Sequence, residues 1–197
     1  MKKHDAFKIE LSYIKDDRIR KSCETILDML PDYFYEIPAS STGKYHPSFS
    51  LGEGGLVRHV KVATRIAYDL FEDPSFKTKY TQNEKDMILM TLILHDSLKS
   101  GLDHSKYTAF NHPILISNFV SDNKDKIELT EDELNFFKTC VESHMGGFPW
   151  NVNSYTNEEL PEPKNKYQVF VHMCDYLSSR KYLDVKFNDK NEIIDRD

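Results

Sequence analysis

The segment DMILMTLILHDSLK, residues 86–99, decides the fold. Its apolar run occupies every side of a helix, which is typical of a helix in the middle of a protein core and not of one at the surface. The run ends in His95-Asp96, where an unpaired carboxylate would be expensive to desolvate. A carboxylate at this depth needs a hydrogen-bonded cation or a metal ion, although a structural His–Asp pair explains the dipeptide alone equally well.

Apolar periodicity and end signals predict further helices around this central one. The central helix itself is opened by a capping box of Thr81 and Glu84. Other helices are expected at 16–30, at 56–71, from Pro113 to about 120, from the capping box of Thr130 and Glu133 to Gly146-Gly147, and from 166 to about 182. Strand signals are weak. Residues 1–12 are compatible with a short strand or an extended arm, and 185–194 with a hairpin. We therefore predict an all-α fold of about six or more helices.

The length of 197 residues fits one domain of ordinary size. We expect an N-terminal helix and lead-in loop over 1–50, packed on a helical domain at 51–182, with a tail or hairpin at 183–197. The formal net charge of −6 argues against a broad basic face, so no extended nucleic-acid groove is expected. A small charged ligand suits this composition better.

The three cysteines are widely spaced and odd in number, which indicates reduced thiols. The longest apolar stretch is too short to span a bilayer. The basic N-terminus, MKKHDAFKIE, is not followed by the apolar region of a signal peptide. A cytoplasmic protein without membrane association is therefore expected.

Four histidines and two aspartates fall at or near the inward faces of five predicted helices. They are His59, His95, Asp96, His112, His144 and Asp175. Each one alone is more often a core or capping residue, but together they form the ligand set of transition metals such as Mn, Fe, Ni and Zn. Asp96 is placed to bridge two ions about 3.5–4 Å apart. A second His-Asp pair, His4-Asp5, is expected to be frayed and without function.

The order of these six residues resembles the H…HD…H…H…D pattern of HD-domain phosphohydrolases, over about residues 40–182. GGLVRHVKVA (54–63), LILHDSLKSG (92–101), ESHMGG (142–147) and CDYLSSRKY (174–182) look like the family's local motifs. Leu98 replaces the usual glycine after the His-Asp pair, and Met145 stands where some two-metal members have a second histidine. The loop at 38–59 is similar to that of small bacterial HD hydrolases and HD-type 3′–5′ exoribonucleases, in which a histidine at the position of His46 lies near the site.

The resemblance implies a metal-dependent phosphohydrolase that cleaves a phosphoester or phosphoanhydride, with a nucleotide or dinucleotide as the expected substrate. It implies one or two divalent ions (Mn, Fe, Ni, Zn or Mg). The first would be held by His59, His95, Asp96 and Asp175, and the second by His112 and His144 with Asp96 bridging. The expected catalytic residues are Asp96 and Lys99.

The expected substrate-binding residues are His46, Lys99, Arg180 and Trp150, with a hydrophobic lid as the other interpretation of Trp150. Three alternatives stay open: an HD-type exonuclease acting on short strands, a non-catalytic ligand-sensing module, and a di-iron oxygenase with the same ligands. The sequence leaves the metal, the exact substrate and the oligomeric state undetermined.

Overall fold

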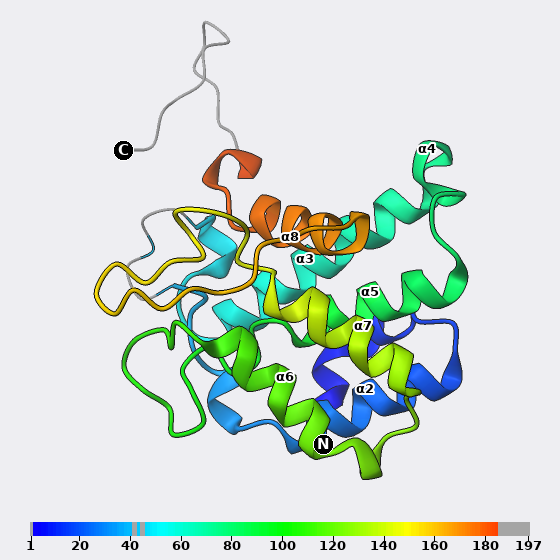
Figure 1. Ribbon diagram of the computed structural model, residues 1–197, viewed down its shortest axis with the longest axis horizontal. Helices are drawn as coiled ribbons and strands as arrows, with labels where there is room; N and C mark the ends of the chain where they lie inside the picture. Colours follow the sequence, from blue (N-terminus) through cyan, green and yellow to red (C-terminus); the bar gives the residue numbers. More distant parts are fainter. Residues whose placement is uncertain (1, 41–42, 44–45, 185–197) are drawn as a thin grey trace, which may run out of the picture.

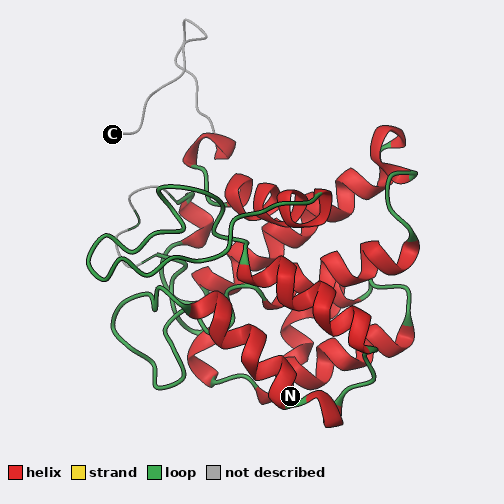
Figure 2. Cartoon of the chain, viewed as in Figure 1, coloured by secondary structure: helices red, strands yellow, loops and turns green. Residues whose placement is uncertain are grey.

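The computed structural model describes residues 2–40, 43 and 46–184. Across these residues the chain forms eight α-helices and no β-sheet, which confirms the predicted all-α fold (Figures 1 and 2). The α-helices are α1 (Lys8–Leu11), α2 (Asp17–Met29), α3 (Gly55–Glu72), α4 (Pro74–Lys77), α5 (Gln82–Leu94), α6 (His112–Asp122), α7 (Glu131–Glu142) and α8 (Lys166–Ser178). Short 3₁₀ turns are η1 (Lys3–Phe7), η2 (Asp32–Tyr35), η3 (Ser48–Ser50), η4 (Lys124–Lys126) and η5 (Lys181–Asp184).

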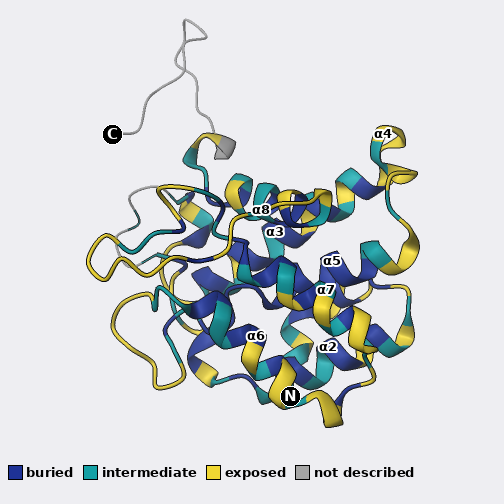
Figure 3. Ribbon diagram, in the orientation of Figure 1, coloured by how far each residue is buried: buried dark blue, intermediate teal, exposed yellow. Residues whose placement is uncertain are grey.

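Helix α5 lies in the middle of the molecule, in contact with α2, α3, α7 and α8 (Figures 1 and 3). Every residue from Asp86 to Leu94 is buried, as expected of a run that is apolar on all sides. The Thr81 hydroxyl accepts from the backbone N–H of Glu84, whose carboxylate accepts from the Thr81 N–H at 2.7 Å. The capping box therefore starts the helix where the sequence predicted it, and α5 ends by placing His95 and Asp96 at the depth of the core.

The prediction of an extended arm or strand at 1–12 is wrong, because these residues form η1 and α1. Phe7 and Leu11, one helical turn apart, are buried in the same core as Ile26. A single apolar pair is too short a pattern to reveal a helix by periodicity. The expectation of a frayed His4 is also wrong, since its backbone N–H and its imidazole Nδ1 both contact the Asp28 carboxylate, at 3.0 and 2.9 Å.

Two helices end earlier than predicted. Helix α7 ends at Glu142, so His144 lies in the turn after the helix and not in its last turn. Helix α8 ends at Ser178, and η5 follows it. The hairpin expected in 185–194 lies outside the described residues. None of the helices in the described ranges is long and apolar enough to cross a membrane.

The long connections gather at one end of the helical bundle (Figures 1 and 2). They are the segment that leads into α3, the loop between α5 and α6, and the loop between α7 and α8. The start of α3 packs closely on the first of these. A Cβ atom at Gly55 would stand only 2.2 Å from the backbone oxygen of Ser50, so the glycine permits this close approach.

Candidate metal centre

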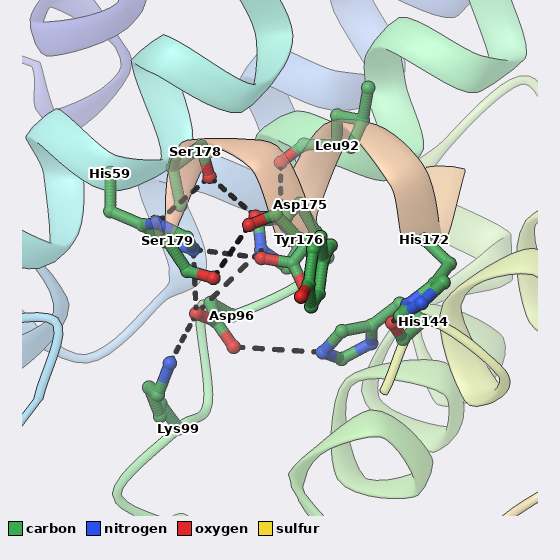
Figure 4. A network of polar contacts seen from close by, with 12 residues as sticks. His59, Leu92, Asp96, Lys99, His144, His172, Asp175, Tyr176, Ser178 and Ser179 are labelled. Atoms are coloured by element: carbon green, nitrogen blue, oxygen red, sulfur yellow. Dashed lines mark hydrogen bonds and ion pairs between the residues drawn. The ribbon is translucent and has the colours of Figure 1, made fainter. Parts of the chain in front are cut away.

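The structure brings all six predicted ligand residues together. Figure 4 shows four of them, His59, Asp96, His144 and Asp175. His59 comes from the second turn of α3, and Asp175 from α8. His95 is the C-cap of α5, followed by Asp96, while His112 begins α6 and His144 follows α7. The four histidines and Asp96 are at most 1% exposed, whereas the Asp175 side chain is 18% exposed and faces a cavity.

Two groups within this cluster have the geometry to hold a metal ion. The first is His59, His95 and Asp175, and the second is His95, Asp96 and His144, with one ligand atom per residue and all such atoms within 4.8 Å of one another. Asp96 lies between the groups. Its Oδ2 stands 3.4 Å from His59 Nε2, and its Oδ1 stands 3.0 Å from His112 Nε2. His95 is the residue that the two groups share, whereas Asp96, the bridging carboxylate that the sequence suggested, belongs to the second group and lies beside His59 of the first.

Hydrogen bonds fix which imidazole nitrogen carries the proton. Nδ1 of His95, His112 and His144 lies 2.7–2.8 Å from the backbone carbonyl of the residue three positions earlier. A carbonyl oxygen only accepts, so each Nδ1 is the donor and each neutral ring keeps its Nε2 lone pair free.

His59 reaches the same state by a different route. The Ser178 hydroxyl donates to the Asp175 carbonyl and so accepts from His59 Nδ1, 3.0 Å away. All four Nε2 atoms are therefore directed as metal ligands require.

The ligand atoms are poorly satisfied by one another. Nε2 of His59, Nε2 of His95 and Oδ1 of Asp96 are buried without an aligned hydrogen-bond partner, although other site atoms lie nearby. The Nε2 atoms of His112 and His144 face each other at 3.2 Å, where two lone pairs repel. A buried polar atom without a partner is costly. A divalent cation would satisfy these atoms, and neutral imidazoles with carboxylates are a suitable donor set for one.

The electrostatics keep the carboxylates ionised. Burial by itself raises the pKa of Asp96, but Lys99 and His95 outweigh burial and hold that pKa well below its usual value. The Lys99 ammonium donates to Asp96 Oδ2 at 2.6 Å. Burial also raises the pKa of Asp175, but the imidazoles of His95 and His59, in their protonated form, outweigh burial and hold that pKa well below its usual value. Both aspartates thus carry the charge that a cation requires.

A cavity of about 190 Å³, here called cavity A, opens onto the centre beside His59 and Asp175. All four predicted substrate-binding residues line it: His46, Lys99, Trp150 and Arg180. The His46 ring lies 5.7 Å from that of His59, and burial, followed by the charge of Lys99, lowers the pKa of His46 to about 4. Trp150 is half exposed, on the loop between α7 and α8.

Sequence reasoning missed how Arg180 is held. Its guanidinium lies 4.1 Å from the centre of the Tyr176 ring, and its Nη2 donates to the Ser179 hydroxyl at 2.7 Å. Tyr176 precedes Arg180 by four residues, a helical spacing that brings side chains together. The contact between Tyr176 and Arg180 could therefore have been predicted from the sequence.

Three further positions complete the surroundings. His172 holds the turn that carries His144, because its Nδ1 donates to the His144 carbonyl at 2.8 Å. Met145 lines cavity A, and Leu98 is fully buried in the core. The two departures from the family motif therefore occupy a cavity wall and a packing position.

Comparisons with protein-family models, with curated proteins and with solved structures find no match for this chain.

Proposed function

We propose that this protein is a metal-dependent phosphohydrolase that cleaves a phosphoester or phosphoanhydride bond in a small phosphorylated substrate, with a nucleotide favoured. One observation carries the proposal: a buried cluster of imidazoles and carboxylates opens into a cavity that holds Lys99 and Arg180. Metal ligands on one side and fixed cations on the other suit a phosphoryl group, which binds to both.

His59, His95 and Asp175 would hold one divalent ion, and Asp96, His112 and His144, with His95 adjacent, would hold a second. When bound, such ions would polarise phosphoryl oxygens and lower the pKa of water, which supplies a nucleophile near neutral pH. The ions considered are Mn, Fe, Ni, Zn and Mg, with imidazole ligands favouring the transition metals.

The chain's own residues position the substrate. The Arg180 guanidinium lies over the Tyr176 ring and donates to Ser179, contacts that position it for bidentate contact with a phosphate. Lys99 supplies a second positive charge, next to Asp96. The pKa of His46 is lowered to about 4, so His46 is neutral near pH 7 and can exchange a hydrogen bond with the substrate without adding charge.

Trp150 favours a base-bearing substrate because its ring forms part of the wall of cavity A. With few cations beside the centre and a net charge of −6, affinity for long nucleic acid is expected to be low. Mononucleotides, dinucleotides or strand ends should therefore be cut in preference to long polymers.

The test is a panel of nucleotides, dinucleotides and short RNAs, each assayed with Mn, Mg, Fe, Ni and Zn in turn. The inactive reference is Asp96→Asn, and the matched control is Asp69→Asn, an exposed aspartate on α3 paired with Arg65. We expect phosphate or nucleotide release that Asp96→Asn abolishes and Asp69→Asn retains. Metal-dependent oxygen consumption without phosphoester cleavage would refute the proposal in favour of a di-iron oxygenase. Tight, salt-sensitive binding of long RNA together with exonucleolytic cleavage would show that the substrate is a nucleic-acid strand and not a small molecule.

A further inference from the structure

A second cavity of about 270 Å³, here called cavity B, adjoins the candidate centre and shares Lys99 with cavity A. Its remaining lining comes from two connections at the loop end of the bundle. These residues are Ile37, Pro38, Ala39, Ser100, His104, Ser105, Lys106 and Thr108. None of the metal-ligand candidates is among them, so cavity B is separate from the reacting position.

The polar lining of cavity B has the character of an anion site. Lys106 brings one ammonium group, and Lys99 brings a second that is paired with Asp96. Ser100 and Thr108 bring hydroxyls, while the Ser105 hydroxyl already donates to the Tyr107 carbonyl. No aspartate or glutamate is found among the lining residues. Ammonium and hydroxyl groups donate to phosphate or carboxylate oxygens, and no acidic side chain in the described wall offsets the charge of Lys106.

Contacts from the buried Tyr33 and within the loop itself hold the wall of cavity B in place. The hydroxyl of Tyr33, a residue only 5% exposed, donates to the Gly101 carbonyl at 2.6 Å. The Tyr33 ring stacks on His104 with 4.7 Å between ring centres. The backbone N–H of Ala109 donates to the Lys99 carbonyl at 2.8 Å, which closes the loop on itself. The cavity therefore rests on a support from η2 and is not merely a gap beneath a loop.

We infer that cavity B binds a second anionic group of the substrate, separated from the reacting phosphoryl group by the side chain of Lys99. This inference rests on the proposed function. The reacting group belongs at the inner end of cavity A, beside His59 and Asp175, and Lys99 touches both cavities. The substrate class is thus a phosphorylated compound with two anionic groups, and not a simple monophosphate.

The test compares three probes: AMP, adenosine 3′,5′-bisphosphate and diadenosine tetraphosphate. The second anion is absent in the first, a terminal monoester in the second and part of a polyphosphate chain in the third. Binding is measured by calorimetry with a chelator present, so that no turnover occurs, and steady-state kinetics are measured with metal. The variants are Lys106→Gln and Lys106→Glu, with Lys21→Gln and Lys21→Glu as charge-matched controls at an exposed position outside both cavities.

We expect the preference for at least one doubly anionic probe over AMP to fall about five- to tenfold in Lys106→Gln, and further in Lys106→Glu. The change should appear in KM and not in kcat, because Lys106 lines cavity B and is not among the residues that line cavity A. The probe that loses affinity identifies the source of the second anion. Equal preferences in the Lys106 and Lys21 variants would overturn the inference. If no probe is hydrolysed but the calorimetric preference still depends on Lys106, the proposed function fails while the anion site stands.

Discussion

The position of one proton on each imidazole decides whether the centre can accept a cation. Carbonyl groups at the end of a helix lack intrahelical partners. The carbonyls of Leu92 and Val141, near the ends of α5 and α7, are occupied by the Nδ1 protons of His95 and His144. The same hydrogen bond therefore completes the helix end and leaves Nε2 free for a ligand role. Replacement of His95 or His144 by asparagine or glutamine would not reproduce this arrangement.

Lys99 is the residue whose substitution best separates catalysis from metal binding. An ammonium group cannot ligate a cation, and Lys99 lines cavity A while its Nζ contacts Asp96. We predict that Lys99→Ala lowers kcat by about 10²–10³-fold while the metal content stays near that of the wild type. Metal content is measured by elemental analysis and turnover on the best substrate of the panel. Lys99→Arg, which keeps the charge, should recover part of the activity. A parallel loss of metal and activity in Lys99→Ala would show that Lys99 acts by shaping the ligand cluster.

At the scale of elements, helix starts were predictable, whereas the ends of two helices, α7 and α8, were placed too late. The capping boxes at Thr81 and Thr130 are local sequence signals, and each one forms as a pair of reciprocal hydrogen bonds. The end of α7 was placed too late, because His144 continues the apolar stripe while the backbone has already left the helix at Ser143. Periodicity records which face is buried and does not record whether the last turn is still helical.

The turn after α7 depends on Gly146, which has φ +91. A Cβ atom there would meet His172 Cε1 at 2.4 Å, so a side chain would displace the imidazole that holds the His144 carbonyl. We predict that Gly146→Ala lowers the free energy of unfolding by about 2–3 kcal/mol, measured in urea, and weakens metal binding.

The matched control for this prediction is Gly52→Ala. Gly52 has a similar left-handed backbone, with φ +68, but nothing lies within 4 Å of its Cβ position. Gly52→Ala should lower the free energy of unfolding by only about 1 kcal/mol, the conformational cost of that backbone region. Equal losses in the two variants would mean that His172 moves aside freely and does not fix the turn.

At the scale of the whole molecule, one carboxylate joins three helices. Glu133 at the start of α7 accepts two hydrogen bonds from Arg18 of α2, both at 2.7 Å, and one from Asn83 of α5 at 2.7 Å. Arg18, ahead of the opposing effect of burial, lowers the pKa of Glu133 to about 2. No sequence signal links residues 115 positions apart, so this connection could not be predicted from the sequence.

The lowered pKa of Glu133 gives a pH-dependent stability. A carboxyl whose pKa is lowered on folding stabilises the fold above its usual pKa of about 4.5, and this contribution disappears as the pH falls through about 2. We predict that Glu133→Gln lowers the free energy of unfolding by at most about 3 kcal/mol at pH 7, and that the difference from wild type shrinks below pH 4.5. Urea titrations at a series of pH values measure it. Glu131→Gln, an exposed change in the same helical turn, should differ little from wild type at any pH; a pH-independent deficit in Glu133→Gln would contradict the assignment.

Metal should stabilise the whole fold, because its ligands come from five segments spread between His59 and Asp175 and converge only in the folded state. At a metal concentration 100 times Kd, binding adds about 2.7 kcal/mol. We predict a rise in Tm of about 5–10 °C, which excess chelator reverses. Differential scanning calorimetry measures the rise, and Asp69→Asn should show it in full. If metal raised the Tm of Asp96→Asn as much as that of the wild type, the central position of Asp96 in the metal site would be refuted.

The sequence carried enough signal to predict that the six candidate ligands converge, because each one follows or occupies an apolar helix. It carried little about cavity B, whose lining residues lie in loops without periodicity. Burial of α5 on all sides and local capping boxes made the bundle predictable. The cavities depend on how distant loops meet, and single-sequence patterns do not contain that relation.

The long connections gather at one end of the bundle (Figure 1), and under the proposed function this arrangement would separate the reacting centre from substrate recognition. The six candidate metal ligands lie on helices or on the turns that directly follow them, whereas His46, Lys106 and Trp150 belong to the connections. Descendants of such a chain can acquire a different substrate by exchanging a loop while inheriting the same chemistry intact. The connections are therefore the natural place to graft new specificities, by evolution or in the laboratory, without rebuilding the scaffold.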